Sequence, residues 1–375
     1  MKFSVLINSI KENILKLKTK NRRLSTKAKI DFLYQFGTLL NSGIPITNAL
    51  KIMIYQTENK NIKTIIEVIL DDLNKGISLK ESILKFPLIF KQFDYSIIEM
   101  GELTGKVGDS IEIIKEKEEK SKELKSKILG AFIYPIIITS LSIGMITIFI
   151  LYVIPKITDM YKDAKVNLPK LTQFVIDLSD FLQKNIVILC ISLSLIIFLI
   201  YTFKTHKKTK IYFDKYIVRM PIFGILLKKK ILAIFTSSLG TLLKNGVIIN
   251  KSLEISAGVV SNDFYKKEIE KIIQGISSGE DFSKMLGIDN IKEIRKYNTF
   301  PMEIASIVKI GEQTGKLPEL LIKISEKYNK EIDNVVKNLS TAIEPLVIVF
   351  VGSIIGTLIM AIMLPFFNMV NVIGN

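Results

Sequence analysis

The sequence has almost none of the residues from which metal centres, disulfide frameworks and histidine-based active sites are built. Its 375 residues include one cysteine, one histidine and no tryptophan. One cysteine excludes a disulfide framework, and the single His206 excludes a His-rich metal site and argues against catalysis by histidine. The composition is instead apolar and basic, with 48 % hydrophobic residues and a formal net charge of +16. A mean hydropathy of +0.34 is too high for an ordinary soluble protein, so we predict a membrane protein.

Charge is also missing from three long runs, 131–154, 186–203 and 345–375, which contain no Asp, Glu, Lys, Arg or His. The first run would form a helix of about 36 Å, which is long enough to cross the hydrocarbon core of a bilayer. Backbone inside a bilayer must satisfy its own hydrogen bonds, and continuous apolarity favours helices over alternating strands. We therefore predict transmembrane helices at 131–154, 186–203 and 343–367.

Lysine and arginine are distributed unevenly around these predicted helices. The part of the chain before the first helix holds 23 of them, the part between the second and third holds 24, and the loop between the first and second holds 5. Because basic loops stay in the cytoplasm, we expect cytoplasmic domains at 25–130 and 204–342, an external loop at 155–185 and an external tail at 368–375. Segment 1–24 is not a signal peptide, since its apolar stretch is short and runs into charge, and we expect it to be cytoplasmic.

The two cytoplasmic segments are related by an internal duplication. Three motifs recur in the same order: GTLLNSG (37–43) as GTLLKNG (240–246), GELTGK (101–106) as GEQTGK (311–316), and Phe86-Pro87 as Phe300-Pro301. With this alignment the stretch between the Phe-Pro pair and the following Gly-Glu pair is four residues shorter in the second repeat. Apolar residues in both repeats have helical spacing, so the predicted fold class is all-α. It is a polytopic membrane protein with three transmembrane helices and two homologous cytoplasmic bundles of about five or six helices each.

Matched residues predict where helices end and begin. Gly43 and Gly246 stand where a helix is expected to end on a left-handed residue. Thr47 and Asn250 are the matched candidates for capping the helix that follows.

Two matched prolines, Pro135 and Pro345, stand where each repeat enters the membrane. A proline inside a helix removes a backbone hydrogen bond and bends the helix, so we expect a kink at each.

The two Gly-Glu-x-Thr-Gly-Lys motifs look at first like phosphate-binding loops. A P-loop has a longer spacing between its glycines and a Ser or Thr after the Lys, whereas here Val107 or Leu317 follows. We interpret each motif as a tight glycine turn between two helices, in which Glu102 and Glu312 cap backbone amides or meet a basic residue. With no metal-ligand spacing, no paired acid and base and no nucleophile elbow, we predict no enzymatic activity and no cofactor.

The charge pattern also bears on transport and on nucleic-acid binding. The predicted spans hold no ionisable residue, which disfavours a carrier or pump. The basic runs 204–210 and 228–230 adjoin predicted membrane and fit contact with anionic lipids. They lack interleaved aromatic residues for base stacking, so no nucleic acid is expected as a partner.

In this order and with this duplicated spacing, the motifs resemble those of a known family. The sequence resembles the type II secretion system protein F family, the inner-membrane platform proteins of type II secretion systems and type IV pili. The resemblance extends from about Lys27 to Phe367. The residues that carry the family pattern are Gly43, Pro45, Gly101, Glu102, Gly105, Pro135, Pro155, Gly246, Gly311, Glu312, Gly315, Glu344, Pro345 and Pro365.

The resemblance implies a non-enzymatic assembly protein. Members of the family lie in the bacterial cytoplasmic (inner) membrane and oligomerise. They couple a cytoplasmic hexameric ATPase to the extraction of pilin or pseudopilin subunits into a growing fibre, together with other inner-membrane assembly proteins. The alternatives are a small membrane permease or channel subunit and a membrane-bound enzyme. Neighbouring genes for a secretion ATPase and prepilin-like proteins would favour the platform.

Overall fold

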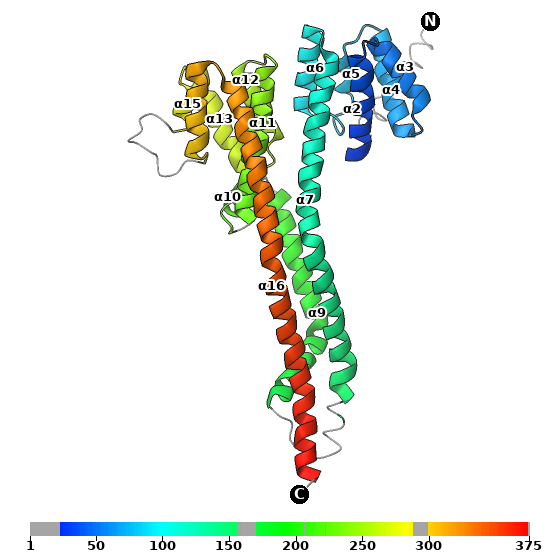
Figure 1. Cartoon of the computed structure of the whole chain (residues 1–375), viewed down its shortest axis with the longest axis vertical. Helices are drawn as coiled ribbons and strands as arrows, with labels where there is room; N and C mark the ends of the chain where they lie inside the picture. Colours follow the sequence, from blue (N-terminus) through cyan, green and yellow to red (C-terminus); the bar gives the residue numbers. More distant parts are fainter. Residues whose placement is uncertain are drawn as a thin grey trace. The chain divides into compact units, whose positions relative to one another are not determined.

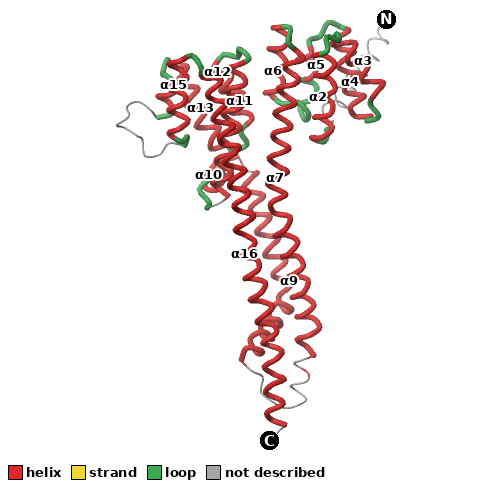
Figure 2. Tube along the Cα trace, viewed as in Figure 1, coloured by secondary structure: helices red, strands yellow, loops and turns green. Residues whose placement is uncertain are grey.

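The computed structural model of the chain describes residues 23–156, 159, 170–205, 207–221, 223–287 and 299–373. These residues form helices and connecting turns, and no strand occurs among them (Figure 2). The prediction of an all-α protein is confirmed.

The two repeats form matching series of helices (Figure 1). The first repeat forms α2 (Thr26–Asn41), α3 (Ile46–Gln56), α4 (Lys60–Asn74), α5 (Leu79–Ile83), α6 (Gln92–Thr104) and the long α7 (Val107–Ile148). The second forms α11 (Phe223–Lys244), α12 (Ile249–Val259), α13 (Asp263–Ser277), α14 (Phe282–Met285), α15 (Met302–Thr314) and the long α16 (Leu317–Ile373). Helices α3 and α12 have 11 residues each, α4 and α13 have 15, and α6 and α15 have 13. The duplication in the sequence is therefore also a duplication of structure.

Local sequence explains these helices, as α4 and α13 illustrate. The side chain of Asn59 accepts hydrogen bonds from the first amides of α4, and Asn262, at the matching position, accepts one from the Tyr265 amide of α13. Such a cap satisfies N–H groups that have no partner within the helix. Along α4, Ile62, Ile65 and Ile69 recur at helical spacing and are buried in the core.

Both repeats belong to one compact unit, formed by the chain up to Ser126 together with Ile217–Ile332. Inside this unit α6 contacts α12, and Leu242 and Ile255 of the second repeat share a core with the first. The separation into two cytoplasmic domains at 25–130 and 204–342 therefore stays a prediction.

The second compact unit comprises Lys127–Tyr216 and Asp333–Asn375. It contains the later parts of α7 and α16, the π-helical segment η1 (Phe149–Val153), α9 (Lys170–Thr205) and nearly all of α10 (Lys207–Ile217). Ile154, Val175 and Ala361 form a small buried cluster here, and the buried Thr172 hydroxyl donates a 2.8 Å hydrogen bond to the Ala361 carbonyl.

Pro155 accounts for the π-helical segment. A proline in a helix cannot donate to the carbonyl four residues earlier, and its ring collides with that carbonyl. Directly before Pro155, the Ile154 amide donates to the Phe149 carbonyl, five residues back, and the wider turn relieves the crowding. Pro135 lies inside α7, and α16 runs through Pro345 and Pro365. The kinks expected at Pro135 and Pro345 stay predictions.

In the described part of the chain, the helical stretch Val107–Lys156 is long and apolar enough to cross a membrane, with a mean hydropathy of 2.4 in its most apolar window. Pro345–Ala361 is apolar but shorter. The count of three transmembrane helices stays a prediction.

Candidate functional site

The Gly-Glu-x-Thr-Gly motifs form the two corners from which the long helices start. Helix α6 ends at Thr104, Gly105 adopts a left-handed conformation with φ +72°, and α7 begins at Val107. At the second corner Gly315 has φ +69°. Glycine reaches this region without the clash that a Cβ would bring, so the expected glycine turn between two helices is confirmed.

The glutamates of the two motifs cap backbone amides, which is the first of the two roles predicted for them. Glu102 accepts hydrogen bonds from the backbone amides of Leu79 (2.5 Å) and Lys80 (3.1 Å) at the start of α5. Glu312 accepts from Phe282 (2.9 Å) and Ser283 (3.2 Å) at the start of α14. Each carboxylate places a negative charge at a helix N-terminus and satisfies two amides there.

The first glycine of each motif permits a close approach between helices. A Cβ on Gly101 would lie 2.2 Å from the Ser110 Oγ on α7. A Cβ on Gly311 would lie 2.7 Å from the Cα of Leu317 on α16. Both distances are far inside van der Waals contact, so only glycine fits without a shift of the long helix.

The first glycine of each Gly-Thr-Leu-Leu motif holds the same long helix from another side. A Cβ on Gly37 of α2 would lie 3.3 Å from Ile111 of α7, and a Cβ on Gly240 of α11 would lie 2.9 Å from the Pro318 carbonyl of α16. The starts of α7 and α16 are therefore each packed against two glycines on different helices.

The second glycine of the Gly-Thr-Leu-Leu motif also behaves as predicted, whereas the following caps do not. Gly43 and Gly246 have φ of +82° and +83°. The prediction that Thr47 and Asn250 cap these helices is wrong. Helix α3 begins at Ile46 and α12 at Ile249, so both residues lie inside the helices. The N-cap positions are occupied by Pro45 and Ile248, which make no side-chain cap.

The alignment of the Phe-Pro pairs also needs correction. The ring of Phe300 packs on Phe235 at 5.4 Å, and the ring of Phe90 packs on the matched Phe32 at 6.4 Å. Phe300 therefore corresponds to Phe90, and Pro301 to Lys91, the N-cap residue of α6. The second repeat is not four residues shorter before Gly311, since its extra length lies between α14 and α15.

A buried cluster of charges in the first repeat was not predicted. The Asp94 side chain is fully buried and accepts from Lys29 Nζ at 2.7 Å and Lys117 Nζ at 3.0 Å. The two lysines also contact Glu118, at 3.0 and 3.3 Å. Asp94 accepts a further hydrogen bond from the Lys91 amide at 3.1 Å. The cluster, which we call the Asp94 cluster, joins α2, α6 and α7.

Electrostatics in the Asp94 cluster favours the charged forms. Burial by itself raises the pKa of Asp94, but the charges and hydrogen bonds of Lys117 and Lys29 outweigh it, so that the pKa lies below its ordinary value. Burial lowers the pKa of Lys117, and the charges of Asp94 and Glu118 raise it above its ordinary value.

The second repeat fills the same place with uncharged side chains. Leu232, Ile304 and Tyr328 occupy the positions of Lys29, Asp94 and Glu118, and all three are buried. Lys327, which matches Lys117, pairs with Glu303 and Glu331 at the surface instead. A comparison of the repeats position by position would have revealed this exchange, because Lys29 falls on the apolar face of its helix.

The remaining predicted residues lie apart from the two corners. Pro135 and Pro345 are inside α7 and α16, and Pro155 follows the π-helical segment. The backbones of Glu344 and Pro365 lie in α16, and their side chains are outside the described part.

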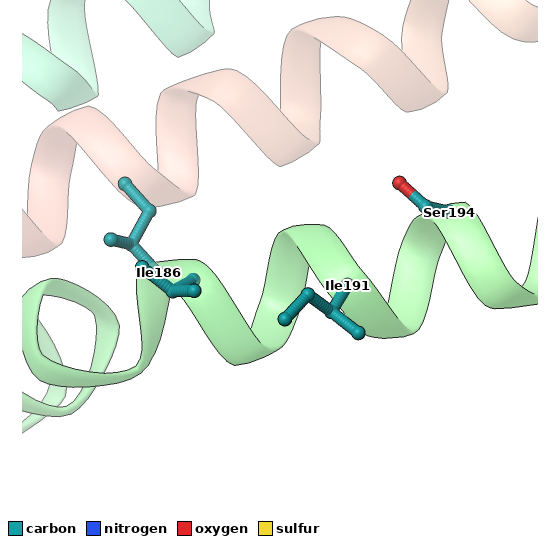
Figure 3. A pocket seen from close by; sticks show the side chains of 4 residues that line it. Ile186, Ile191 and Ser194 are labelled. Atoms are coloured by element: carbon teal, nitrogen blue, oxygen red, sulfur yellow. The ribbon is translucent and has the colours of Figure 1, made fainter.

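The described residues also include an apolar hollow on α9 and no cluster of metal ligands. A hollow on α9 is lined by Ile186, Val187, Ile191 and Ser194, none of them ionisable (Figure 3). Among the described residues, no three His, Cys, Asp or Glu side chains gather to hold a metal ion.

Known proteins with similar sequences belong to pilus and secretion machines. The sequence profile described as type II secretion system (T2SS), protein F matches the chain twice, over residues 32–155 and 235–365. The chain is 30% identical over 347 residues to the type IV pilus assembly protein PilC of Pseudomonas aeruginosa, covering 92% of this chain and 90% of that protein. It is 29% identical to PilC of Thermus thermophilus, covering 92% and 82%. It is 23% identical to the type II secretion system protein F of Vibrio cholerae, covering 94% and 85%. The paired profile matches cover both repeats, and the chain belongs to the type II secretion system protein F family.

Proposed function

We propose that this chain is a non-enzymatic platform in the bacterial inner membrane that couples a cytoplasmic assembly ATPase to the polymerisation of pilin or pseudopilin subunits. The observation that carries the proposal is the construction of α7 and α16. Each starts at a glycine corner, is packed there against two glycines, and continues as one helix from the residues of the first compact unit into those of the second. A continuous helix with a fixed base passes a rotation of that base along its length, and a switching element of this kind needs no catalytic group.

Apolar surface and charge support this location. The apolar part of α7 exposes Ile133, Ile136 and Leu141, which fits contact with lipid chains. With the positive-inside rule, the segment 1–24 and both repeats are cytoplasmic, and the loop 155–185 and the C-terminus are external.

Thiol labelling of intact cells tests this topology. In a Cys190→Ser background, cysteines at Lys80 and Lys284 should be protected from a membrane-impermeant reagent, and one at Lys165 should react. Labelling at position 284 without labelling at 165 would reverse the proposed orientation.

The platform is proposed to act without binding nucleotide itself. The carboxylates of both Gly-Glu-x-Thr-Gly corners are already engaged with backbone amides. Purified protein should show no saturable ATP binding by calorimetry, with or without Lys106→Ala or Lys316→Ala. Micromolar binding would contradict the proposal.

The proposed partners are a hexameric ATPase on the cytoplasmic side, pilin or pseudopilin subunits, other inner-membrane assembly proteins and further copies of this chain. The names of the relatives concern pilus assembly and type II secretion, which supports a role in such a machine. None of the described contacts favours a permease or channel subunit.

Alanine substitution at the corners tests the coupling role. Gly105→Ala and Gly315→Ala should each cost about 1 kcal/mol of local stability, because both residues have positive φ. The control variants are Leu39→Ala and Leu242→Ala, compared at temperatures at which all variants have equal stability and are inserted and abundant. If the corners transmit motion, fibre assembly should fall further in the glycine variants than in these controls. If assembly simply follows stability across the four variants, the corners only fold the protein and the coupling role is refuted.

A further inference from the structure

The short helix α10 directly follows α9, the second predicted transmembrane helix (Figure 1). Helix α9 ends at Thr205 and α10 begins at Lys207. The Thr209 hydroxyl donates a 3.1 Å hydrogen bond to the Phe203 carbonyl in the last turn of α9. The start of α10 is therefore tied to the end of α9, at the depth where a spanning α9 would leave the hydrocarbon core.

The side chains of α10 divide into a buried and an exposed face. Asp214 is buried, whereas Tyr212 and Tyr216 are 68% and 65% exposed. These tyrosines are four residues apart, so they lie on the same face of the helix. By contrast, Tyr265 and Tyr328 are almost fully buried in the second repeat. Two neighbouring tyrosine side chains on an exposed face fit an environment that contacts the apolar ring and hydrogen-bonds the hydroxyl.

The charge of α10 identifies that partner. Lys207, Lys208, Lys210 and Lys215 are its basic residues, against the single acid Asp214. A helix with aromatic residues on its open face and several lysines is typical of helices that lie at the boundary between lipid headgroups and acyl chains. Tyrosine is enriched at this boundary on both sides of a membrane. Each lysine near an anionic leaflet adds attraction to lipid phosphate.

We propose that α10 is a lipid-interface helix, in which Tyr212 and Tyr216 insert among the headgroups of an anionic leaflet and the net positive charge of the helix is attracted to lipid phosphates. The inference rests on the proposed membrane location, since α9 must span the bilayer for α10 to reach its surface. It assigns the helix a task in the platform: α10 fixes the depth of the point where the chain leaves the membrane and enters the second repeat.

The absence of tryptophan allows a direct test. Tyr212→Trp and Tyr216→Trp each give the full-length chain a single tryptophan. In proteoliposomes that contain brominated phosphatidylcholine and phosphatidylglycerol, both should be strongly quenched and blue-shifted. Ile143→Trp, in the apolar part of α7, is the control for insertion, and Tyr55→Trp on α3, at a side chain 91% exposed, should remain unquenched.

The outcomes separate the inference from the proposed function. If Ile143→Trp is quenched and the two α10 tryptophans are not, α10 does not contact lipid and the inference is overturned. This would also be the result if the tyrosine face binds a protein partner. If Ile143→Trp itself is unquenched, the membrane location fails first.

Lipid charge is tested with the same variants. Quenching on α10 should be stronger with phosphatidylglycerol than with phosphatidylcholine alone, and the difference should disappear in high salt. Equal quenching in both lipids would overturn the attraction between α10 and anionic lipid.

Discussion

Substitution of Asp94 by asparagine should destabilise the first repeat far more than removal of an exposed charge on the same helix. Asparagine keeps an oxygen for the Lys91 amide, so the cap at the start of α6 is retained and the change is one of charge. It leaves Lys29, whose side chain is only 7% exposed, with Glu118 as its remaining carboxylate.

The magnitude follows from burial. Breaking a buried ion pair by removing one partner costs about 3–5 kcal/mol. We therefore expect a loss within that range.

The second repeat supplies the matched replacement. Lys29→Leu/Asp94→Ile/Glu118→Tyr copies Leu232, Ile304 and Tyr328 into the first repeat. Exchanging the buried ions Lys29, Asp94 and Glu118 for uncharged side chains resembles replacements of buried ion pairs that are often neutral or stabilising by about 1–4 kcal/mol, against about 1 kcal/mol for the lost cap at Lys91. The Lys117 side chain is 25% exposed and can extend to water. The triple variant should therefore stay close to wild type.

Hydrogen exchange of the α6 amides in detergent-solubilised protein measures these differences locally. Asp94→Asn should raise exchange about a hundredfold or more, since each 1.4 kcal/mol is about tenfold. Glu99 also lies on α6 and is a partly exposed partner of Lys80 on α5. Glu99→Gln should change the exchange rate by less than about tenfold. The reasoning is refuted if Asp94→Asn exchanges no faster than Glu99→Gln, or if the triple variant exchanges faster than Asp94→Asn.

Three further predictions concern the two glycine corners and the Asp94 cluster. Glu312→Ala should destabilise the start of α14 by about 1–2 kcal/mol in amide exchange, and Glu102→Ala should cost α5 less, because Ser78 also caps that helix. Gly101→Ala should lower the thermal stability of the first repeat, and adding Ser110→Gly should restore much of it, because Ser110 supplies the nearest colliding atoms; no recovery would contradict the packing argument. The pKa of Asp94 is lowered in the folded protein, so its ionised carboxylate stabilises the fold above the ordinary carboxyl pKa of about 3.9. This stabilisation is lost as the pH falls through the lower folded pKa. The difference in amide exchange between wild type and Asp94→Asn should therefore shrink in acid.

The features that the sequence predicts correctly are governed by a single residue or by periodicity. A glycine that must adopt positive φ is visible as Gly105 or Gly315, since no other residue fits the turn as well. Glu102 and Glu312 are predicted to cap backbone amides or to meet a basic residue, because their motifs lack the spacing of a phosphate-binding loop, and the first of these roles is the one in the structure. Periodicity likewise predicts the all-α class, because it depends on which residues recur and not on what they touch.

The errors come from features that depend on distant partners. Thr47 and Asn250 have the right chemistry for an N-cap, but the helices begin one residue before them, so both lie in a first helical turn. The Phe-Pro match was misleading because Phe86 and Phe90 are both buried, and only the ring contact with Phe32 identifies Phe90 as the counterpart of Phe300. The Asp94 cluster combines residues from three helices, and its lysines look like ordinary surface charge in the sequence.

The capping glutamates also explain where the two copies can differ in length. Glu312 joins the end of α15 to the start of α14, so the chain from Phe282 to Glu312 forms a closed segment whatever the number of residues between the two helices. Lengthening such a closed loop costs little entropy, about 0.6 kcal/mol for each doubling. The second repeat carries its extra residues in this interval, between Met285 and Met302, and leaves α15 the same length as α6. The interval is therefore the place in the repeat where an inserted epitope or fluorescent tag should disturb the fold least.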